Sequence, residues 1–148
     1  MKIYATEIEG TPRPQGSMQA MVNKNTGTAF VKYGDTTVQH RNAVIAQVAR
    51  EWDGAPCWGD AVAISVEFVF PRPKTHFGTG KNADVLKAVA PVAHVKTPDV
   101  DKLLRLICDA VDIAGVVGDD SQFTIARGEK RYAVKNEQPK TIIEIWSA

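Results

Sequence analysis

Apolar and polar residues alternate most clearly between residues 60 and 70, where every second position from Val62 to Phe70 is apolar. This alternation predicts a β-strand that buries one face, and Pro71 and Pro73 end it because proline cannot donate a ladder hydrogen bond. Short strands over 18–22 and 29–33, on either side of Asn25-Thr26-Gly27, predict a hairpin. We expect further strands over residues 2–9, 122–132 and 140–146.

Two stretches have helical spacing. In residues 36–52, an apolar face is formed by Val38, Ile45, Val48 and Trp52, with Asp35 as the expected cap and Asp53-Gly54 as the end. The stronger helix covers residues 100–114 and ends at Gly115. Its continuous apolar stripe consists of Val100, Leu103, Leu104, Ile107, Ala110, Val111 and Ala114.

The order of these elements is strand, hairpin, helix, strand, helix, strand, strand. It favours an α+β fold of two layers, in which two main helices pack on one face of a mixed β-sheet. The length of 148 residues predicts a single domain over residues 1–148. The connection over residues 72–97 is long for such a domain, and loops of that length are usually functional or disordered.

Composition narrows the class of protein. With 44% hydrophobic and 24% charged residues, the chain is not a disordered chain, a collagen or a disulfide scaffold. It has no apolar run of about 18 residues that would span a membrane, and its first residues lack the apolar stretch of a signal peptide. Cys57 and Cys108 lie far apart and outside any metal-binding spacing. We therefore expect two reduced thiols in a cytoplasmic protein.

The net charge of +1 conceals two basic segments and one acidic segment. Residues 10–33 carry three basic residues and no acid, and residues 72–96 carry five basic residues against one aspartate. Residues 97–120 carry six aspartates against two basic residues. This distribution suits a polyanionic partner beside a cation-binding site, although charges spread over a solvated surface give the same counts. The candidate contacts to a polyanion are Arg13, Lys24, Lys32, Arg72, Lys74, Lys81, Lys87, His94 and Lys96.

The acidic segment holds two pairs of aspartates. Pro98 favours a helix start, so Asp99 and Asp101 lie in the first turn, where the helix dipole alone stabilises acids by about 0.3–1 kcal/mol each. Arg105 follows one turn later, and an ion pair with Asp101 is its simplest structural role. Asp119-Asp120 lie in a short connection where aspartates are common turn residues.

If the strand after Asp119-Asp120 lies beside the strand ending at Phe70, the two pairs approach each other. Two unit charges about 4 Å apart repel by roughly 4 kcal/mol at an effective dielectric of 20, so such a cluster must bind a cation. Oxygen donors without a cysteine or histidine cluster point to Mg²⁺ or Mn²⁺. Such a site suits phosphodiester hydrolysis, with Arg105 on the phosphate and the basic loops on the DNA backbone. No EF-hand, glycine-rich phosphate loop, zinc motif or serine-hydrolase motif is present in the sequence.

At these residues the sequence resembles the RusA family of Holliday-junction endodeoxyribonucleases, especially its phage-type members. The resemblance rests on His94, Pro98, Asp99, Asp101, Leu103, Arg105, Asp109-Ala110, Asp119-Asp120-Ser121-Gln122 and Lys130, with Gly10-Thr-Pro-Arg-Pro-Gln-Gly-Ser17 similar to the opening loop of the family. It implies a RusA-like fold and a homodimer that binds four-way DNA junctions and resolves them by Mg²⁺-dependent paired nicks, in recombination and repair.

The resemblance also implies roles for individual residues. Asp99, Asp101 and Asp120 match the essential carboxylates, and Asp119 matches the adjacent acid, so these four are the candidate metal ligands. Arg105 stands in place of the lysine of the family as a catalytic residue, and it must stabilise charge because arginine does not exchange protons near neutral pH. Lys102, where many members have asparagine, and Lys130 complete the candidate DNA contacts.

Two other functions fit the residues. One is a junction-binding module without catalysis, against which the intact carboxylates count. The other is a metal-dependent phosphohydrolase of a small phosphoester, against which the basic loops count. A metal titration of cleavage tests the first, and the salt dependence of DNA binding tests the second.

Overall fold

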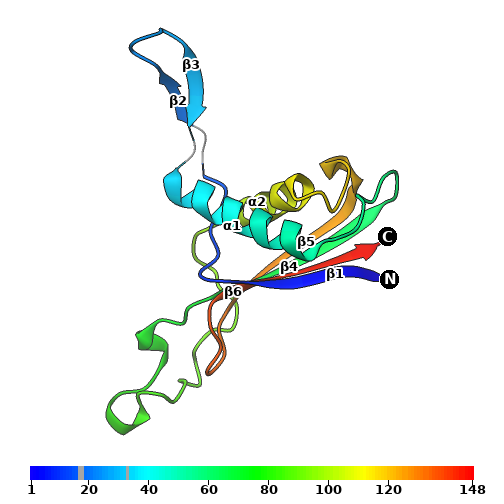
Figure 1. The fold of residues 1–148 in the computed structure, drawn as a ribbon. Coiled ribbons are helices and arrows are strands. Elements are labelled where there is room, and N and C mark those ends of the chain that lie inside the picture. The colour runs from blue at the N-terminus through cyan, green and yellow to red at the C-terminus, as the bar shows by residue number, and fades with distance from the viewer. Residues whose placement is uncertain (17–18, 33) are drawn as a thin grey trace.

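The computed structural model of the chain describes residues 1–16, 19–32 and 34–148. Its centre is a four-stranded sheet in the order β1 (Lys2–Glu9), β6 (Lys140–Ser147), β4 (Val62–Phe70), β5 (Phe123–Tyr132). β6 runs antiparallel to β1 and β4, whereas β4 and β5 are parallel. Helices α1 (Asp35–Glu51) and α2 (Val100–Ile113) lie on the same face of this sheet (Figure 1). The predicted two-layer α+β fold with a mixed sheet is therefore confirmed.

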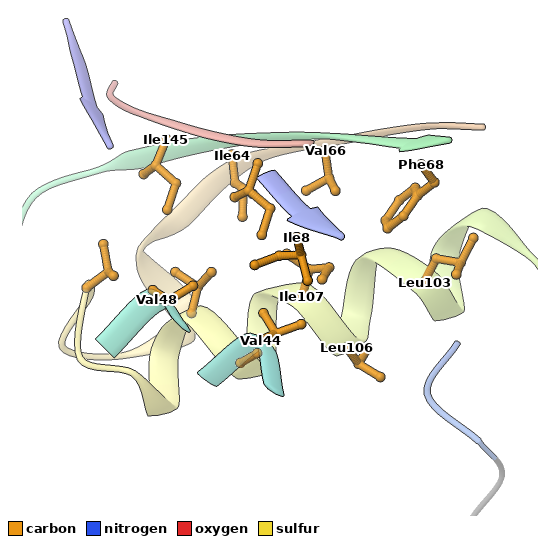
Figure 2. Packing of buried hydrophobic residues seen from close by; sticks show 14 of the residues in the cluster. Ile8, Val44, Val48, Ile64, Val66, Phe68, Leu103, Leu106, Ile107 and Ile145 are labelled. Carbon is orange, nitrogen blue, oxygen red and sulfur yellow. The ribbon is translucent and has the colours of Figure 1, made fainter. Parts of the chain in front are cut away.

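The core lies between the sheet and α2 (Figure 2). β4 contributes the alternating residues from Val62 to Phe70, all of them buried, as the sequence pattern predicts. α2 buries Leu103, Leu106, Ile107, Ala110 and Val111. Since full burial of one such large side chain contributes about 1.5–3 kcal/mol, this layer fixes the position of α2 over β4 and β5.

Both helices differ in detail from the sequence prediction. Asp35 is the first residue of α1, and Gly34 occupies the N-cap position without a side-chain hydrogen bond, so the predicted Asp35 cap is wrong. The fully buried pair of α1 is Val44 and Val48, an i,i+4 pair of which only Val48 was predicted. In α2, Leu106 is buried although the predicted stripe omits it, because the core there is wider than one stripe.

Two segments project from the layered body (Figure 1). One is the predicted hairpin, formed by β2 (Gln19–Val22) and β3 (Ala29–Lys32), with Gly27 at a φ of 70° in its turn. The predicted strand residues Met18 and Tyr33 lie outside the described residues. The other is the loop over residues 72–97, which contains the 3₁₀ helices η1 (Lys74–His76) and η2 (Gly80–Asn82).

The chain between α2 and β5 is short. It passes through Gly115, which has a φ of 85° and ends the helix as predicted, and then through the 3₁₀ helix η3 (Asp120–Gln122). Cys57 and Cys108 are free thiols. Among the described residues, no helix combines the length and the apolar character that crossing a membrane requires.

Candidate active site

The first acidic pair lies at the start of α2. Asp101 lies in the first turn, as the sequence predicts, whereas Asp99 is the N-cap residue directly before the helix. The Asp99 carboxylate forms no capping hydrogen bond. It instead lies 3.4 Å from the Nζ of Lys102, with both side chains more than half exposed. An exposed pair of this kind contributes little to stability, so Asp99 is accessible to a ligand.

Arg105 lies one turn beyond Asp101 and is exposed. Within the described part of the chain, no salt bridge joins Arg105 to Asp101. The i,i+4 ion pair, which is the simplest structural role for this arginine, is therefore absent from the described residues. Its guanidinium is free of that partner and able to bind a phosphate.

The second acidic pair is held by a dense set of hydrogen bonds around Gln122. The Oε1 of Gln122 accepts from the backbone N–H groups of Gly118 (2.8 Å) and Asp119 (3.1 Å). Its Nε2 donates to the carbonyl oxygens of Asp60 (2.9 Å) and Cys57. All four contacts are to backbone atoms, so Gln122 fixes the loop that carries Asp119 and Asp120. From the sequence, Gln122 was expected to have no role beyond membership of the motif.

Asp119 also closes a capping box at η3. Its Oδ1 accepts from the backbone N–H of Ser121 at 2.9 Å. Hydrogen bonds from the Ser121 side chain and backbone hold the pKa of Asp119 below its usual value. Asp119 is therefore ionised at neutral pH and remains exposed.

The neighbours of this pair lie on the second half of α2. Burial, followed by the negative charges of Asp120, Asp119 and Asp109, raises the pKa of Asp112. Burial, followed by Asp109 and Asp120, likewise raises the pKa of Cys108 to about 11. Negative charge is thus concentrated where η3 meets the end of α2.

The two acidic pairs lie toward opposite ends of α2. Asp101 and Asp112 are eleven residues apart in the sequence, which corresponds to about 16 Å along a helix axis. Within the described ranges, no group of three or more histidine, cysteine, aspartate or glutamate side chains is arranged to hold a metal ion. β5 lies beside β4, yet the two pairs do not approach each other within the described residues, so that expectation is wrong. Each pair offers the oxygen donors that suit a hard divalent cation, and the roles of the four aspartates as metal ligands stay predictions.

Some of the predicted DNA contacts hold the 72–97 loop against the sheet. Arg72 donates to the carbonyls of Ala133 (3.0 Å) and Pro91 (2.7 Å) and lies over the ring of Tyr132. His94 stacks on Phe70, with ring centroids 4.0 Å apart. These contacts explain how so long a connection is ordered.

The other basic residues of the loop face solvent. Lys74, Lys81, Lys87 and Lys96 are exposed. Burial, followed by the positive charges of Arg72, Lys96 and Lys87, lowers the pKa of His76, so three basic groups share one region.

In the first basic segment, Arg13 and Lys24 are exposed, and Arg13 lies close enough to His40 to lower its pKa, although burial lowers it more. The side chain of Lys32 lies outside the described part of the chain. Among the described residues of the two basic segments, the exposed basic groups therefore lie on the two projecting segments and on the loop near Arg13.

Comparison with known proteins identifies the family of the chain. The family model for Endodeoxyribonuclease RusA matches residues 10–146, which is nearly the whole chain and includes both acidic pairs and both basic segments. No curated protein matches the chain. The chain belongs to the RusA family of endodeoxyribonucleases, hydrolases that cleave DNA phosphodiester bonds at Holliday junctions.

Proposed function

We propose that this nuclease resolves four-way junctions by paired symmetric nicks in the presence of Mg²⁺, with Mn²⁺ as a substitute. The observation that carries the proposal is the exposure of Asp101, Asp119 and Asp120, none of which forms a salt bridge within the described residues. Exposed, unpaired carboxylates beside basic segments suit a cation that bridges protein and phosphate. We assign the cleavage to a single domain that works in the cytoplasm, in recombination and repair.

The candidate ligands form two sets, Asp99 with Asp101 at the start of α2 and Asp120 near its end, with Asp119 as a further ligand or as a support for Asp120. A bound divalent cation would supply the polarised phosphate and the activated water of hydrolysis. Arg105 lies on the exposed side of α2 and offsets the charge that develops on the non-bridging oxygens. Its permanent charge excludes it from proton transfer.

Recognition of the junction is assigned to the projecting segments. The exposed basic residues of the hairpin and of the 72–97 loop contact the phosphate backbone of the arms. A homodimer suits this substrate, because the two-fold axis of a dimer matches the near two-fold symmetry of a junction and places two sites on opposing strands.

The experiment compares a synthetic four-way junction with a linear duplex of the same sequence, in Mg²⁺, Mn²⁺, Ca²⁺ and EDTA. The proposal predicts symmetric nicks on the junction alone, in Mg²⁺ and Mn²⁺. Tight binding of the junction without cleavage in either ion would identify a non-catalytic binding module. Cleavage of the junction and of the duplex at equal rates would contradict the proposed selectivity. Binding that is insensitive to salt would instead favour a small phosphoester as substrate.

A further inference from the structure

Lys130 lies on β5, opposite Phe68 of β4 in the sheet register. Its side chain is half-buried rather than extended into solvent. The Nζ donates one hydrogen bond to the carbonyl oxygen of Lys96 at 2.6 Å and a second to that of Pro98 at 2.7 Å. A lysine ammonium has three donors, so two of the three are used on the chain that leads into α2.

The residues between His94 and Asp99 belong to no helix or strand. At the start of this segment, the backbone N–H of His94 donates to the carbonyl of Lys130 at 3.2 Å. At its end, the Lys130 ammonium binds the carbonyl of Pro98, the residue directly before Asp99. Both ends of the segment are therefore attached to one residue of β5.

The same strand also supports the first turn of α2. A Cβ built on Gly128 would lie 2.9 Å from the Cγ2 of Val100, so the helix packs against bare backbone there. Gly128 and Lys130 are two residues apart on one strand and thus face the same side of the sheet. Together these two residues position the turn that carries Asp99 and Asp101 against β5.

We propose that Lys130 is a positioning residue for Asp99 and Asp101 and does not bind DNA through its ammonium group. Its two hydrogen bonds hold the backbone before Asp99, and thereby the direction in which both carboxylates point. This inference rests on the proposed junction cleavage and deepens it. Loss of a group that orients metal ligands typically costs 10–100-fold in affinity or activity.

The test uses Lys130→Met, which removes the donors but keeps the aliphatic stem, and Lys130→Arg, which keeps the positive charge in a different geometry. Lys96→Met is the matched comparison, because it removes an exposed charge from the same segment and leaves the Lys96 carbonyl in place. Three quantities are measured: the Kd for the junction in EDTA, the single-turnover cleavage rate of bound junction in Mg²⁺, and amide exchange at Leu103, whose N–H donates to the Asp99 carbonyl at 3.2 Å.

We expect both Lys130 variants to bind the junction within twofold of the unaltered protein. We expect Lys130→Met to cleave bound junction about 10–100-fold more slowly, Lys130→Arg to be intermediate, and amide exchange at Leu103 to be faster in both. For Lys96→Met we expect a Kd that rises several-fold at an unchanged cleavage rate. The same result for Lys130→Met would overturn the proposal. So would cleavage and exchange rates equal to those of the unaltered protein.

If Lys130→Met does not fold, Lys130→Arg alone tests the proposal. A residue that contacts phosphate tolerates replacement by arginine, whereas the hydrogen bonds from the Lys130 ammonium to the Lys96 and Pro98 carbonyls do not. If the unaltered protein cleaves no junction, the proposed function fails while amide exchange at Leu103 still reports whether Lys130 holds the start of α2.

Discussion

Asp120 lies within electrostatic range of Asp112, a residue in the last full turn of α2: burial and then the negative charge of Asp120 raise the pKa of Asp112. The second acidic pair is therefore near the end of α2, whereas Asp99 and Asp101 lie at its start. β5 runs back from η3 along α2 toward the first pair (Figure 1). One helix and one strand therefore position all four carboxylates, each pair with its own supporting contacts.

Replacement of Gln122 by glutamate tests the support of the second pair. The variant places a carboxylate oxygen against the carbonyls of Asp60 and Cys57, which now accept from Nε2. Loss of two hydrogen bonds with repulsion in their place should lower the free energy of unfolding by about 2–4 kcal/mol. Chemical denaturation measures the change. Stability equal to that of the unaltered protein would show that the loop does not depend on Gln122.

Replacement of Gly128 by alanine tests the support of the first pair. The added Cβ would lie 2.9 Å from the Cγ2 of Val100, and overpacking of this kind typically costs about 1–3 kcal/mol. The double variant with Val100→Ala lacks the Cγ2 atom that the added Cβ would meet. It should therefore recover most of the lost free energy of unfolding. Denaturation of the single and double variants checks this coupling. Additive effects of the two substitutions would contradict the contact.

Acid stability depends on Glu137 in the turn between β5 and β6. Its carboxylate accepts hydrogen bonds from Arg131, which also binds Glu67, and these bonds lower the pKa of Glu137 to about 2. The folded-state pKa lies below the unfolded value, so the stabilisation is complete above about pH 4.5 and is lost as the pH falls toward 2. It amounts to something on the order of 1–3 kcal/mol.

The expected outcome is that Glu137→Gln lowers stability at pH 7 and flattens the dependence of the unfolding free energy on pH between about 4.5 and 2. Urea denaturation at a series of pH values measures both effects. A slope identical to that of the unaltered protein would show that Glu137 is not the group that titrates.

Lys74, Lys81 and Lys87 are exposed on the 72–97 loop and are predicted to bind phosphates. Each phosphate contact contributes a slope of about −0.9 to log K against log salt concentration. Substitution of all three lysines by alanine should weaken junction binding and reduce the slope by about 2–3. Lys2→Ala is the control, since Lys2 pairs with Glu144 at 2.7 Å on the sheet. An unchanged slope in the triple variant would show that these lysines of the loop do not contact the DNA.

The sequence predicted the elements well because their signals are local. The alternation from Val62 to Phe70 and the apolar stripe of α2 each follow from burial of one face. The position of Val44 in the core was missed because α1 packs on both α2 and β1, so that its buried face is set by tertiary contacts.

The candidate site was predictable only in part. The acidic pairs and the basic segments are visible as charge, and the family match covers them. The two pairs lie toward opposite ends of α2, a helix of 14 residues, so the pairing of β5 with β4 does not bring them together as expected. Arg72 and His94 were predicted as DNA contacts, yet they hydrogen-bond or stack within the fold. A sequence shows that a side chain is basic or aromatic, but not which neighbour it meets.

The most direct test of the account is single-turnover cleavage of a four-way junction by Asp101→Asn and by Asp120→Asn, with junction binding measured in parallel. Asp53→Asn is the control, because Asp53 is an exposed aspartate just after α1 that belongs to neither acidic pair. Each of the first two variants should bind the junction as tightly as the unaltered protein and lose cleavage, while the control should keep both. Cleavage at an unaltered rate by either Asp101→Asn or Asp120→Asn would contradict the assignment of both acidic pairs to one reaction.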